Sequence, residues 1–308
     1  MTVGFVGLGR MGGHMCRHLI AGHDVVVFDV SADAVRTCVE AGATSVASVA
    51  DVARAADVLF TSLPMPADVE TVALGPGGIR AGARPGTVYF DLSTSSPAVS
   101  RRVGAALEDA GITMLDAPVS GGPSGAEAGT LGVMVGGPRD AFDAHLPLLE
   151  TFAGTVVHVG DLGSGLVAKL VNNLIALASV AAACEGLMLG AAAGIDLRRL
   201  DAAIRASTGD SLAYRFLADR AFSGDYTPAF TMDLAYKDIH LALELADELG
   251  VPAPIGGDVH DLMRMAKGLG LGDADPTAVM RVYETTLQRS ISELAGSAEE
   301  AAEEAAAS

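Results

Sequence analysis

A glycine-rich turn close to the amino terminus constrains the fold more than any other feature of the chain. The stretch GFVGLGRMGG holds Gly7, Gly9 and Gly12 in the spacing G-x-G-x-x-G, after a strand-like run at 3–7 and before a helical run. The next strand-like run ends at Asp29, 22 residues after Gly7. A strand, a tight turn, a helix and a second strand that ends in an acidic residue form the first half of a nucleotide-binding α/β fold.

The turn itself predicts a dinucleotide site. Gly7 would allow the tight turn, Gly9 would let the backbone approach a pyrophosphate, and Gly12 would let the helix pack on its strand. The pyrophosphate would lie at the helix N-terminus, where free N–H groups and the helix dipole favour anions. We therefore expect the whole turn to bind the cofactor, including Leu8, Arg10 and Met11 between the glycines.

The acidic residue after the second strand predicts which cofactor binds. The carboxylate of Asp29 can accept hydrogen bonds from both ribose hydroxyls and would repel a 2′-phosphate. The residues directly after it, Val30 and Ser31, are not arginine. We expect NAD rather than NADP, and Arg36 is the residue most able to reverse that preference.

The first half of the chain alternates strand-like and helical runs, which predicts a doubly wound α/β sheet of Rossmann type. After Gly165 the sequence predicts helices only. We expect a dinucleotide-binding domain at 1–162, an all-helical substrate and oligomerisation domain at 163–295 joined by a long helix, and a disordered acidic tail at 296–308. The expected strands are 3–7, 24–29, 57–63, 87–92, 112–117, 131–137 and 155–160. The expected helices include 31–41, 97–110, 138–150, 165–193, 196–207, 211–222, 232–249, 255–268 and 276–294.

Composition limits the partners and the compartment. The net charge of −18 argues against nucleic acid and anionic membranes, since phosphates would be repelled. Three scattered cysteines indicate reduced thiols, and the seven histidines show no ligand spacing, so we expect no metal. The sequence opens on a strand-like run, without the basic start and cleavage site of a secretory leader, so we expect no leader. The longest apolar stretch, 166–195, contains charged and amide side chains, which disfavours a membrane span. We expect a cytoplasmic protein.

A lysine and two asparagines interrupt the largely apolar stretch GSGLVAKLVNN. Lys169 and Asn173 are four residues apart, so on a helix they share one face, and Gly163 and Gly165 before them permit close backbone approach. A lysine buried on a domain-joining helix would release its proton more readily, which suits a general acid and base. The alternative is a snorkelling lysine beside an asparagine that is hydrogen-bonded locally.

A second candidate is the glycine-rich stretch at 116–137, which we expect to be a loop leading into a strand. Ser120, Gly121 and Gly122 could present a hydroxyl and backbone N–H groups to a carboxylate. Many α/β crossovers are rich in glycine, so this stretch by itself indicates little.

Five stretches in order resemble the β-hydroxyacid dehydrogenase family, and most closely its 3-hydroxyisobutyrate dehydrogenase branch. They are GFVGLGRMG, DLSTSSPAVS, DAPVSGGPSGAEAGTL, GSGLVAKLVNN and FTMDLAYKDIHLAL. The resemblance covers nearly the whole chain apart from the acidic tail. It implies a Rossmann-type domain followed by a helical domain, in a homodimer or homotetramer that acts on a small carboxylate.

The resemblance also implies roles for the residues that match its motifs. Lys169 matches the family's catalytic lysine, and Asn173 matches an asparagine that orients the substrate. The stretch Ser120, Gly121 and Gly122 matches the loop that binds the substrate carboxylate.

Further matches fall on the cofactor side. Thr94 matches a residue that touches the cofactor, and Lys237 matches a lysine near both cofactor and substrate. Leu63, Pro64 and Met65 lie where the family's loop passes the adenosine and the nicotinamide. The implied reaction is NAD-dependent oxidation of a short β-hydroxy acid to its semialdehyde, with Lys169 as general acid and base.

One stretch departs from this pattern and leaves the substrate open. Within ASTGDSLAYRF the chain has Asp210 and Leu212 where close relatives often carry an arginine and a tryptophan. Two alternatives remain on the same fold. A tartronate semialdehyde reductase would usually have Asn-Arg in place of Asp29-Val30, and an imine reductase would usually have Asp or Tyr in place of Lys169. From a different class, a non-catalytic NAD-binding protein would not need this lysine, asparagine and carboxylate loop.

Overall fold

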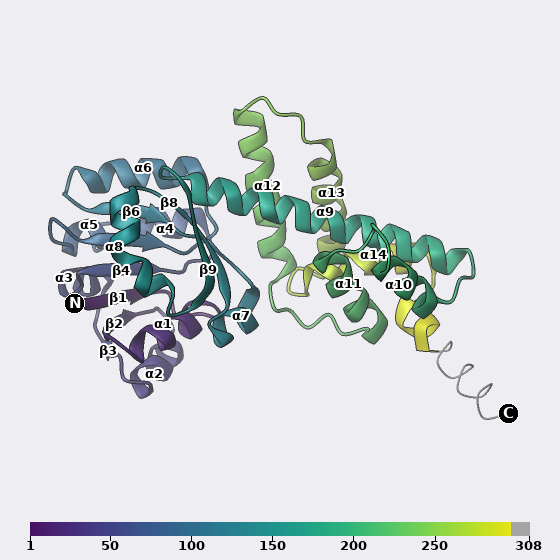
Figure 1. Ribbon diagram of the computed structural model, residues 1–308, viewed down its shortest axis with the longest axis horizontal. Helices are drawn as coiled ribbons and strands as arrows, with labels where there is room; N and C mark the ends of the chain where they lie inside the picture. Colours follow the sequence, from purple (N-terminus) through teal and green to yellow (C-terminus); the bar gives the residue numbers. More distant parts are fainter. Residues whose placement is uncertain (297–308) are drawn as a thin grey trace. The chain divides into compact units, whose positions relative to one another are not determined.

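The computed structural model describes residues 1–296 and shows an α/β unit followed by a helical one (Figure 1). The two compact units are Met1–Val171 and the chain from Asn172 onward, so the division falls within one long helix. The fold class predicted from the sequence is confirmed. Of the predicted acidic tail, 297–308 lies outside the described residues.

A nine-stranded sheet forms the centre of the first unit, in the order β3-β2-β1-β4-β5-β6-β8-β7, with β9 paired to β8. The strands from β3 to β6 are parallel, while β8 runs antiparallel to β6 and β7 and parallel to β9. The sequence predicted all of these strands except the two-residue β3 and β7. The strands are β1 Thr2–Val6, β2 Asp24–Phe28, β3 Thr44–Ser45, β4 Val58–Thr61, β5 Val88–Asp91, β6 Thr113–Asp116, β7 Val119–Ser120, β8 Leu131–Gly136 and β9 Ala153–Gly160.

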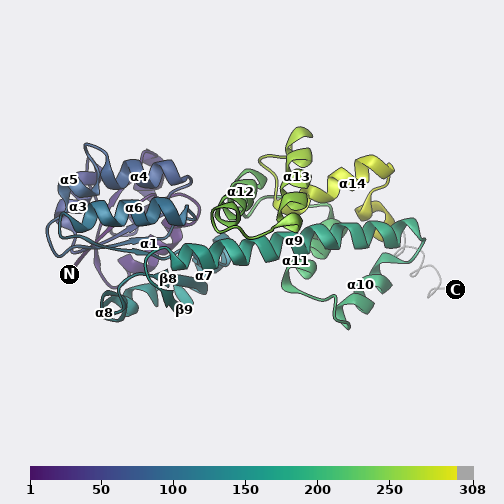
Figure 2. The same ribbon diagram turned by 90° about the horizontal axis from the view of Figure 1, so that it is seen from above.

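Helices cover both faces of this sheet, which explains why its central strands are continuous apolar runs. Alternate strand residues enter two separate cores, so Phe5 lies in one and Val6 in the other. In Figure 2, α4 and α6 lie together on one side of the sheet. The helices are α1 Gly12–Ile20, α2 Ala32–Glu40, α3 Val49–Ala55, α4 Pro66–Leu74, α5 Ile79–Gly82, α6 Pro97–Glu108, α7 Gly122–Ala128 and α8 Arg139–Leu149.

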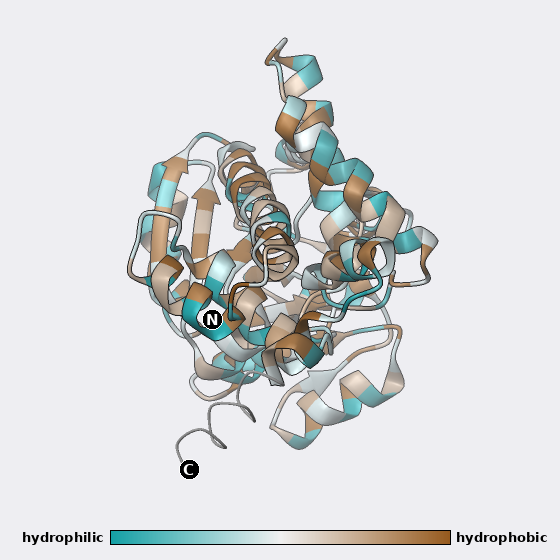
Figure 3. Cartoon of the chain, turned by 90° about the vertical axis from the view of Figure 1, so that its right-hand side faces the viewer, coloured by the Kyte–Doolittle hydropathy of each residue, from teal (hydrophilic) through white to brown (hydrophobic). Residues whose placement is uncertain are grey.

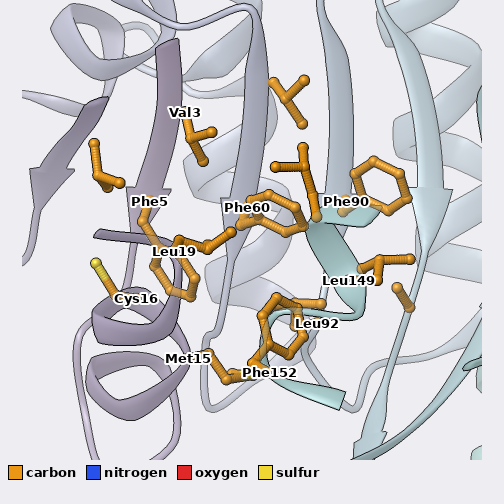
Figure 4. Packing of buried hydrophobic residues seen from close by; sticks show 14 of the residues in the cluster. Val3, Phe5, Met15, Cys16, Leu19, Phe60, Phe90, Leu92, Leu149 and Phe152 are labelled. Atoms are coloured by element: carbon orange, nitrogen blue, oxygen red, sulfur yellow. The ribbon is translucent and has the colours of Figure 1, made fainter. Parts of the chain in front are cut away.

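The core under α1 is built on aromatic rings. Phe60 stacks between Phe5 and Phe90, with ring centroids 6.1 and 5.3 Å away, and it meets Phe152 edge-on. Figure 4 shows these rings together with Met15 and other side chains of α1. This packing holds α1 against strands β1, β4 and β5. It therefore fixes the position of α1, the helix that starts at the glycine-rich turn.

The second unit, as far as Gly296, is helical. Its helices mix brown apolar and teal polar residues in Figure 3, as expected for helices with one buried face. The elements are α9 Ser164–Ala192, which starts in the first unit, then α10 Leu197–Arg205, α11 Leu212–Ser223, α12 Met232–Glu248, α13 Pro254–Gly268, the 3₁₀ helix η1 Pro276–Val279 and α14 Met280–Leu287.

The predicted last helix, 276–294, is wrong as a single element. It begins as the 3₁₀ turn η1, and α14 ends at Leu287, because the next residue, Gln288, adopts a left-handed conformation with φ of 50°. Beyond this break the Glu284 carboxylate accepts a hydrogen bond of 2.8 Å from the Ile291 N–H. A periodic apolar pattern does not reveal such a break, because the helical spacing resumes after it.

Helix α9 is unusually apolar. Within residues 1–296 it is the one helix with the length and hydropathy of a membrane span, with a mean hydropathy of 1.9 in its most apolar window. One face, including Leu177, Cys184 and Leu187, enters the core of the helical unit. Val171, Ile175 and Leu189 are exposed.

Candidate active site

The candidate residues of the first unit gather at one edge of its sheet. Strands β1, β4, β5 and β6 are parallel neighbours, so their carboxyl ends meet there. The turn 7–12 follows β1, the loop 63–65 follows β4, and Thr94 follows β5. Ligands of open α/β sheets bind at this edge.

Each glycine of the turn has its own structural reason. Gly7 has φ of 90°, and a Cβ there would lie 2.3 Å from the Ser62 carbonyl oxygen. A Cβ on Gly12 would lie 1.9 Å from the Gly7 carbonyl oxygen, so only glycine lets α1 start so close to the turn. Gly9 is exposed, and a Cβ there would meet no atom within 4 Å, so its backbone faces open space. This space at the start of α1 fits the pyrophosphate of a dinucleotide.

Asp29 follows the end of β2 and contacts the same turn. Its carboxylate accepts hydrogen bonds from the Leu8 N–H at 2.5 Å and from the Ser31 N–H at 2.7 Å. The acidic side chain therefore lies beside the glycine turn. Arg36 is paired with Asp33 on the exposed surface of α2, at 2.6 Å.

The loops after β4 and β5 are fixed to each other by residues that the sequence did not single out. The Leu63 N–H donates to Ser93 Oγ at 2.9 Å. The Asp91 carboxylate in turn accepts from the Ser93 N–H at 3.1 Å and from Thr61 Oγ1 at 2.9 Å. Asp91 is fully buried, and it thereby positions the segments that hold Leu63 and Thr94. Beyond them, Pro64 and Met65 are exposed before α4.

The expected glycine-rich stretch does lead into a strand, β8, but the part before that strand is not a simple loop. Ser120 belongs to the short strand β7, and α7 begins two residues later. Gly121 and Gly122 form the turn between them, with φ of 128° and 64°. His18 of α1 holds the far end of α7, with Nε2 3.0 Å from the carbonyl oxygen of Ala126. The glycine-rich composition concealed a short helix whose packing fixes the turn.

Lys169 lies in the second turn of α9 and is buried, with 8% of its surface exposed. The start of the helix is anchored to the sheet by Asp116, the last residue of β6. Its carboxylate accepts hydrogen bonds of 2.6 Å from the N–H groups of Gly163 and Leu166. No sequence pattern indicates this contact, since Asp116 is 47 residues before Gly163.

Asn173 lies one turn beyond Lys169 and is equally buried, with 8% exposed. Its side-chain amide donates to the Asp238 carboxylate of α12 at 2.7 Å. The other oxygen of Asp238 lies 3.2 Å from Lys237 Nζ. Asp238, which is 1% exposed, therefore joins two predicted site residues. The sequence did not single out Asp238, and its place after Lys237 in the AYKD motif was the only sign of its involvement.

The stretch that departs from the family pattern starts α11. The Asp210 carboxylate pairs with the Arg215 guanidinium, and Ser211 caps the helix by accepting from the Tyr214 N–H at 3.0 Å. Leu212 is 85% exposed. Residues 1–296 contain no group of three His, Cys, Asp or Glu side chains able to hold a metal ion.

Two family profiles match consecutive parts of the chain. The NAD binding domain of 6-phosphogluconate dehydrogenase matches residues 2–160. A family described as the NAD-binding domain of NADP-dependent 3-hydroxyisobutyrate dehydrogenase matches residues 163–283.

Individual proteins are similar over almost their full length. The chain is 38% identical to 2-(hydroxymethyl)glutarate dehydrogenase of Eubacterium barkeri, over 95% of this chain and 98% of the relative. It is 40% identical to a probable mitochondrial 3-hydroxyisobutyrate dehydrogenase of Dictyostelium discoideum, over 90% and 89%. The solved structure of Mycobacterium tuberculosis 3-hydroxyisobutyrate dehydrogenase with L-serine superposes with a TM-score of 0.85 at 33% identity, over 91% of this chain and 98% of that one.

The fold, the glycine turn and these similarities define the class of protein, a nicotinamide-dependent oxidoreductase that acts on a CH–OH group. Within that class the chain belongs to the β-hydroxyacid dehydrogenase family, close to the 3-hydroxyisobutyrate dehydrogenases. The family predicted from the five motifs is confirmed. The roles of the individual site residues stay predictions.

Proposed function

We propose that the protein oxidises a short β-hydroxy acid to its semialdehyde with NAD, with Lys169 as the general acid and base. The observation that carries this proposal is the buried amine of Lys169, in the second turn of a helix whose start is anchored to the dinucleotide-binding unit. Burying a lysine side chain on this mostly apolar helix costs folding free energy, which supports a chemical role for its amine.

In the proposed reaction, each residue of the site has one role. Ser120 and the N–H groups of Gly121 and Gly122 bind the substrate carboxylate, and Asn173 orients the substrate. Lys169 Nζ takes the hydroxyl proton during oxidation and returns it during reduction, which stabilises the developing alkoxide. A bound nicotinamide supplies the acceptor for the hydride from the same carbon.

For the cofactor we propose NAD in preference to NADP. Asp29 lies beside the glycine turn, where a carboxylate binds ribose hydroxyls and repels a 2′-phosphate. Arg36, the cation most able to favour NADP, is paired with Asp33. The expected result is a KM for NADP at least about tenfold above that for NAD, from one unfavourable charge contact.

For the substrate we propose an acid with a hydroxymethyl group on the carbon that bears the carboxylate. The names of two relatives, 2-(hydroxymethyl)glutarate and 3-hydroxyisobutyrate dehydrogenase, describe acids of this kind. Asp210 and Leu212 replace the family's usual residues in the segment that lines the substrate. We therefore expect the preferred side chain on that carbon to differ from that of 3-hydroxyisobutyrate.

We also propose a cytoplasmic homodimer or homotetramer that binds neither nucleic acid nor membranes. The net charge of −18 supports the last two points, since it would repel anionic polymers and lipids. The exposed apolar residues Val171, Ile175 and Leu189 of α9 are candidates for the contact between subunits. Light scattering after size-exclusion chromatography tests the assembly.

The test of the function is a spectrophotometric assay at the absorbance of reduced nicotinamide. Purified protein is supplied with NAD or NADP and a panel of acids: 3-hydroxyisobutyrate, 3-hydroxypropionate, 2-(hydroxymethyl)glutarate, L-serine and 3-hydroxybutyrate. Turnover of at least one primary alcohol with NAD is expected, with weaker activity on the secondary alcohol 3-hydroxybutyrate. Absence of turnover with every acid, in either direction, would contradict the proposal.

A further inference from the structure

Asp116 makes a contact that neither the reaction nor the family motif explains. It is the last residue of β6 and is fully buried. Its two carboxylate oxygens accept hydrogen bonds of 2.6 Å from the N–H groups of Gly163 and Leu166. These N–H groups lie at the start of α9, where the first turn of a helix has no intrahelical acceptor. Asp116 thus caps α9 from a distant strand.

The surrounding backbone is shaped to allow this contact. A Cβ on Gly136 of β8 would lie 2.5 Å from Asp116 Oδ1. A Cβ on Gly165, in the first turn of α9, would lie 2.4 Å from the Met134 carbonyl oxygen and 2.9 Å from Asp116 Oδ2. The helix start therefore sits directly on the strand ends, and two glycines make the close approach possible. All of these residues belong to the unit Met1–Val171.

Lys169 follows Leu166 by three residues, which is about 4.5 Å along a helix and on nearly the same side of it. A shift of the first turn therefore moves the lysine with it. We propose that Asp116 is a positioning residue for the reaction: by holding the Gly163 and Leu166 amides it sets where the Lys169 amine lies. The proposal rests on the function proposed above for Lys169.

The energetics favour a role in positioning over one in stability. Burial, together with the charge of Asp91 at the neighbouring register position on β5, raises the pKa of Asp116 to about 6 although two N–H groups bind it. On the helix side, Arg101 of α6 contributes a cation: its guanidinium lies beside Gly163, and its Nε donates to the Leu162 carbonyl oxygen. At neutral pH the ionised Asp116 carboxylate therefore lowers the free energy of unfolding. Such a loss of stability is common where residues are placed for activity.

The first test compares Asp116→Asn with Asp275→Asn. Asp275 is also a buried aspartate at a helix start: it accepts from the Thr277 N–H at 3.1 Å and lies 3.8 Å from Arg220. Asp116→Asn leaves one N–H of α9 facing an amide NH₂ group. Its kcat is expected to fall about 10- to 100-fold, with the dissociation constant for NADH unchanged. Its Tm is expected to change by only a few degrees, about as much as a 1 kcal/mol effect.

Two readouts do not depend on turnover. Hydrogen–deuterium exchange of a peptide spanning 163–170 is expected to be about tenfold faster at the first-turn amides of Asp116→Asn. The rate at which acetic anhydride acylates Lys169, followed by peptide mass spectrometry, is expected to change at least about twofold, since a displaced amine alters its surroundings. Asp275→Asn should lower the Tm but leave kcat, the exchange of 163–170 and the acylation rate as in the wild type.

If Asp116→Asn does not fold, the wild type supplies the same test. After correction for the intrinsic rate, exchange at 163–166 through local opening that leaves Asp116 buried should rise as the pH falls below about 6, because the protonated carboxyl accepts the two N–H bonds less strongly. Unchanged exchange in both experiments would overturn the proposal. Faster exchange with unchanged Lys169 acylation would also overturn it, because Asp116 would then anchor the helix without positioning the amine. A wild type that oxidises no hydroxy acid refutes the proposed function instead, while exchange and acylation still decide the role of Asp116.

Discussion

Two buried aspartates, one in each unit, contact helix α9 near Lys169 and Asn173 in different ways. Asp116 in the first unit accepts hydrogen bonds from the backbone N–H groups of Gly163 and Leu166, which lie six and three residues before Lys169. Asp238 in the second unit binds the side-chain amide of Asn173 directly and lies 3.2 Å from Lys237. The first contact fixes where a helix lies, and the second fixes how a side chain is turned.

The difference matters because the two proposed roles need different support. A proton-transfer group must lie within hydrogen-bond reach of the substrate hydroxyl, so its distance from the substrate is critical. An orienting amide must present its oxygen or its NH₂ group in a defined direction, and a carboxylate partner decides which. Removing the Asp116 carboxylate should therefore produce a different kinetic defect from removing the Asp238 carboxylate.

The largest effect is expected from the lysine of the first unit. Lys169→Ala should lower kcat about 10³-fold, the usual loss when a general acid and base is removed, and should leave NADH binding intact. Lys237→Ala should lower kcat/KM only about tenfold, since an ammonium at the edge of a site aids binding. Equal losses in the two variants would remove the distinction between the units. Lys267→Ala, which breaks an ion pair with Asp233, is the matched surface control.

The next effect concerns pH and the carboxyl of Asp116. Its pKa is about 6 in the folded chain, against 3.8 for an ordinary aspartate. Between these values the folded state holds a proton that the unfolded state has released, so the group's stabilising contribution is complete below about pH 4 and is lost as the pH rises through 6.

Compared with Asp116→Asn, the wild type should therefore lose about 2 to 3 kcal/mol of unfolding free energy between pH 4 and pH 7. Urea denaturation of both proteins at a series of pH values measures this difference. Other titrating groups, such as the Arg102-paired Glu70 with its lowered pKa, cancel in the comparison. Parallel curves would show that the buried carboxylate has an ordinary pKa.

A somewhat smaller effect is expected at Asp238. Asp238→Ala leaves the Asn173 amide without its acceptor, so kcat/KM should fall about 30-fold, chiefly through a higher KM, as for a lost hydrogen bond to a charged group. Asp238→Asn keeps one acceptor oxygen and should recover part of the loss. A variant whose kcat fell while KM stayed constant would place Asp238 in the same role as Asp116.

Much of the fold and of the candidate site could be predicted from the residues within each motif. The glycine turn, the position of Asp29 and the alternation of apolar runs determine the dinucleotide-binding half, because each depends on local conformation and on period-two burial. The spacing of Lys169 and Asn173 places both on one face of α9 for the same local reason. The short helix α7 and the break at Gln288 were missed, since glycine content and apolar spacing do not distinguish them from a loop or a continuous helix.

Only the tertiary structure decided which residues these groups bind. Asp116 and Gly163 are 47 positions apart, and Asn173 and Asp238 are 65 apart. The Asp116 carboxylate can meet its partner only after β6 has joined the sheet. The Asp238 carboxylate can meet its partner only after α12 has packed against α9. Local sequence encodes conformation over a few residues, whereas a buried hydrogen bond between distant segments depends on the whole fold.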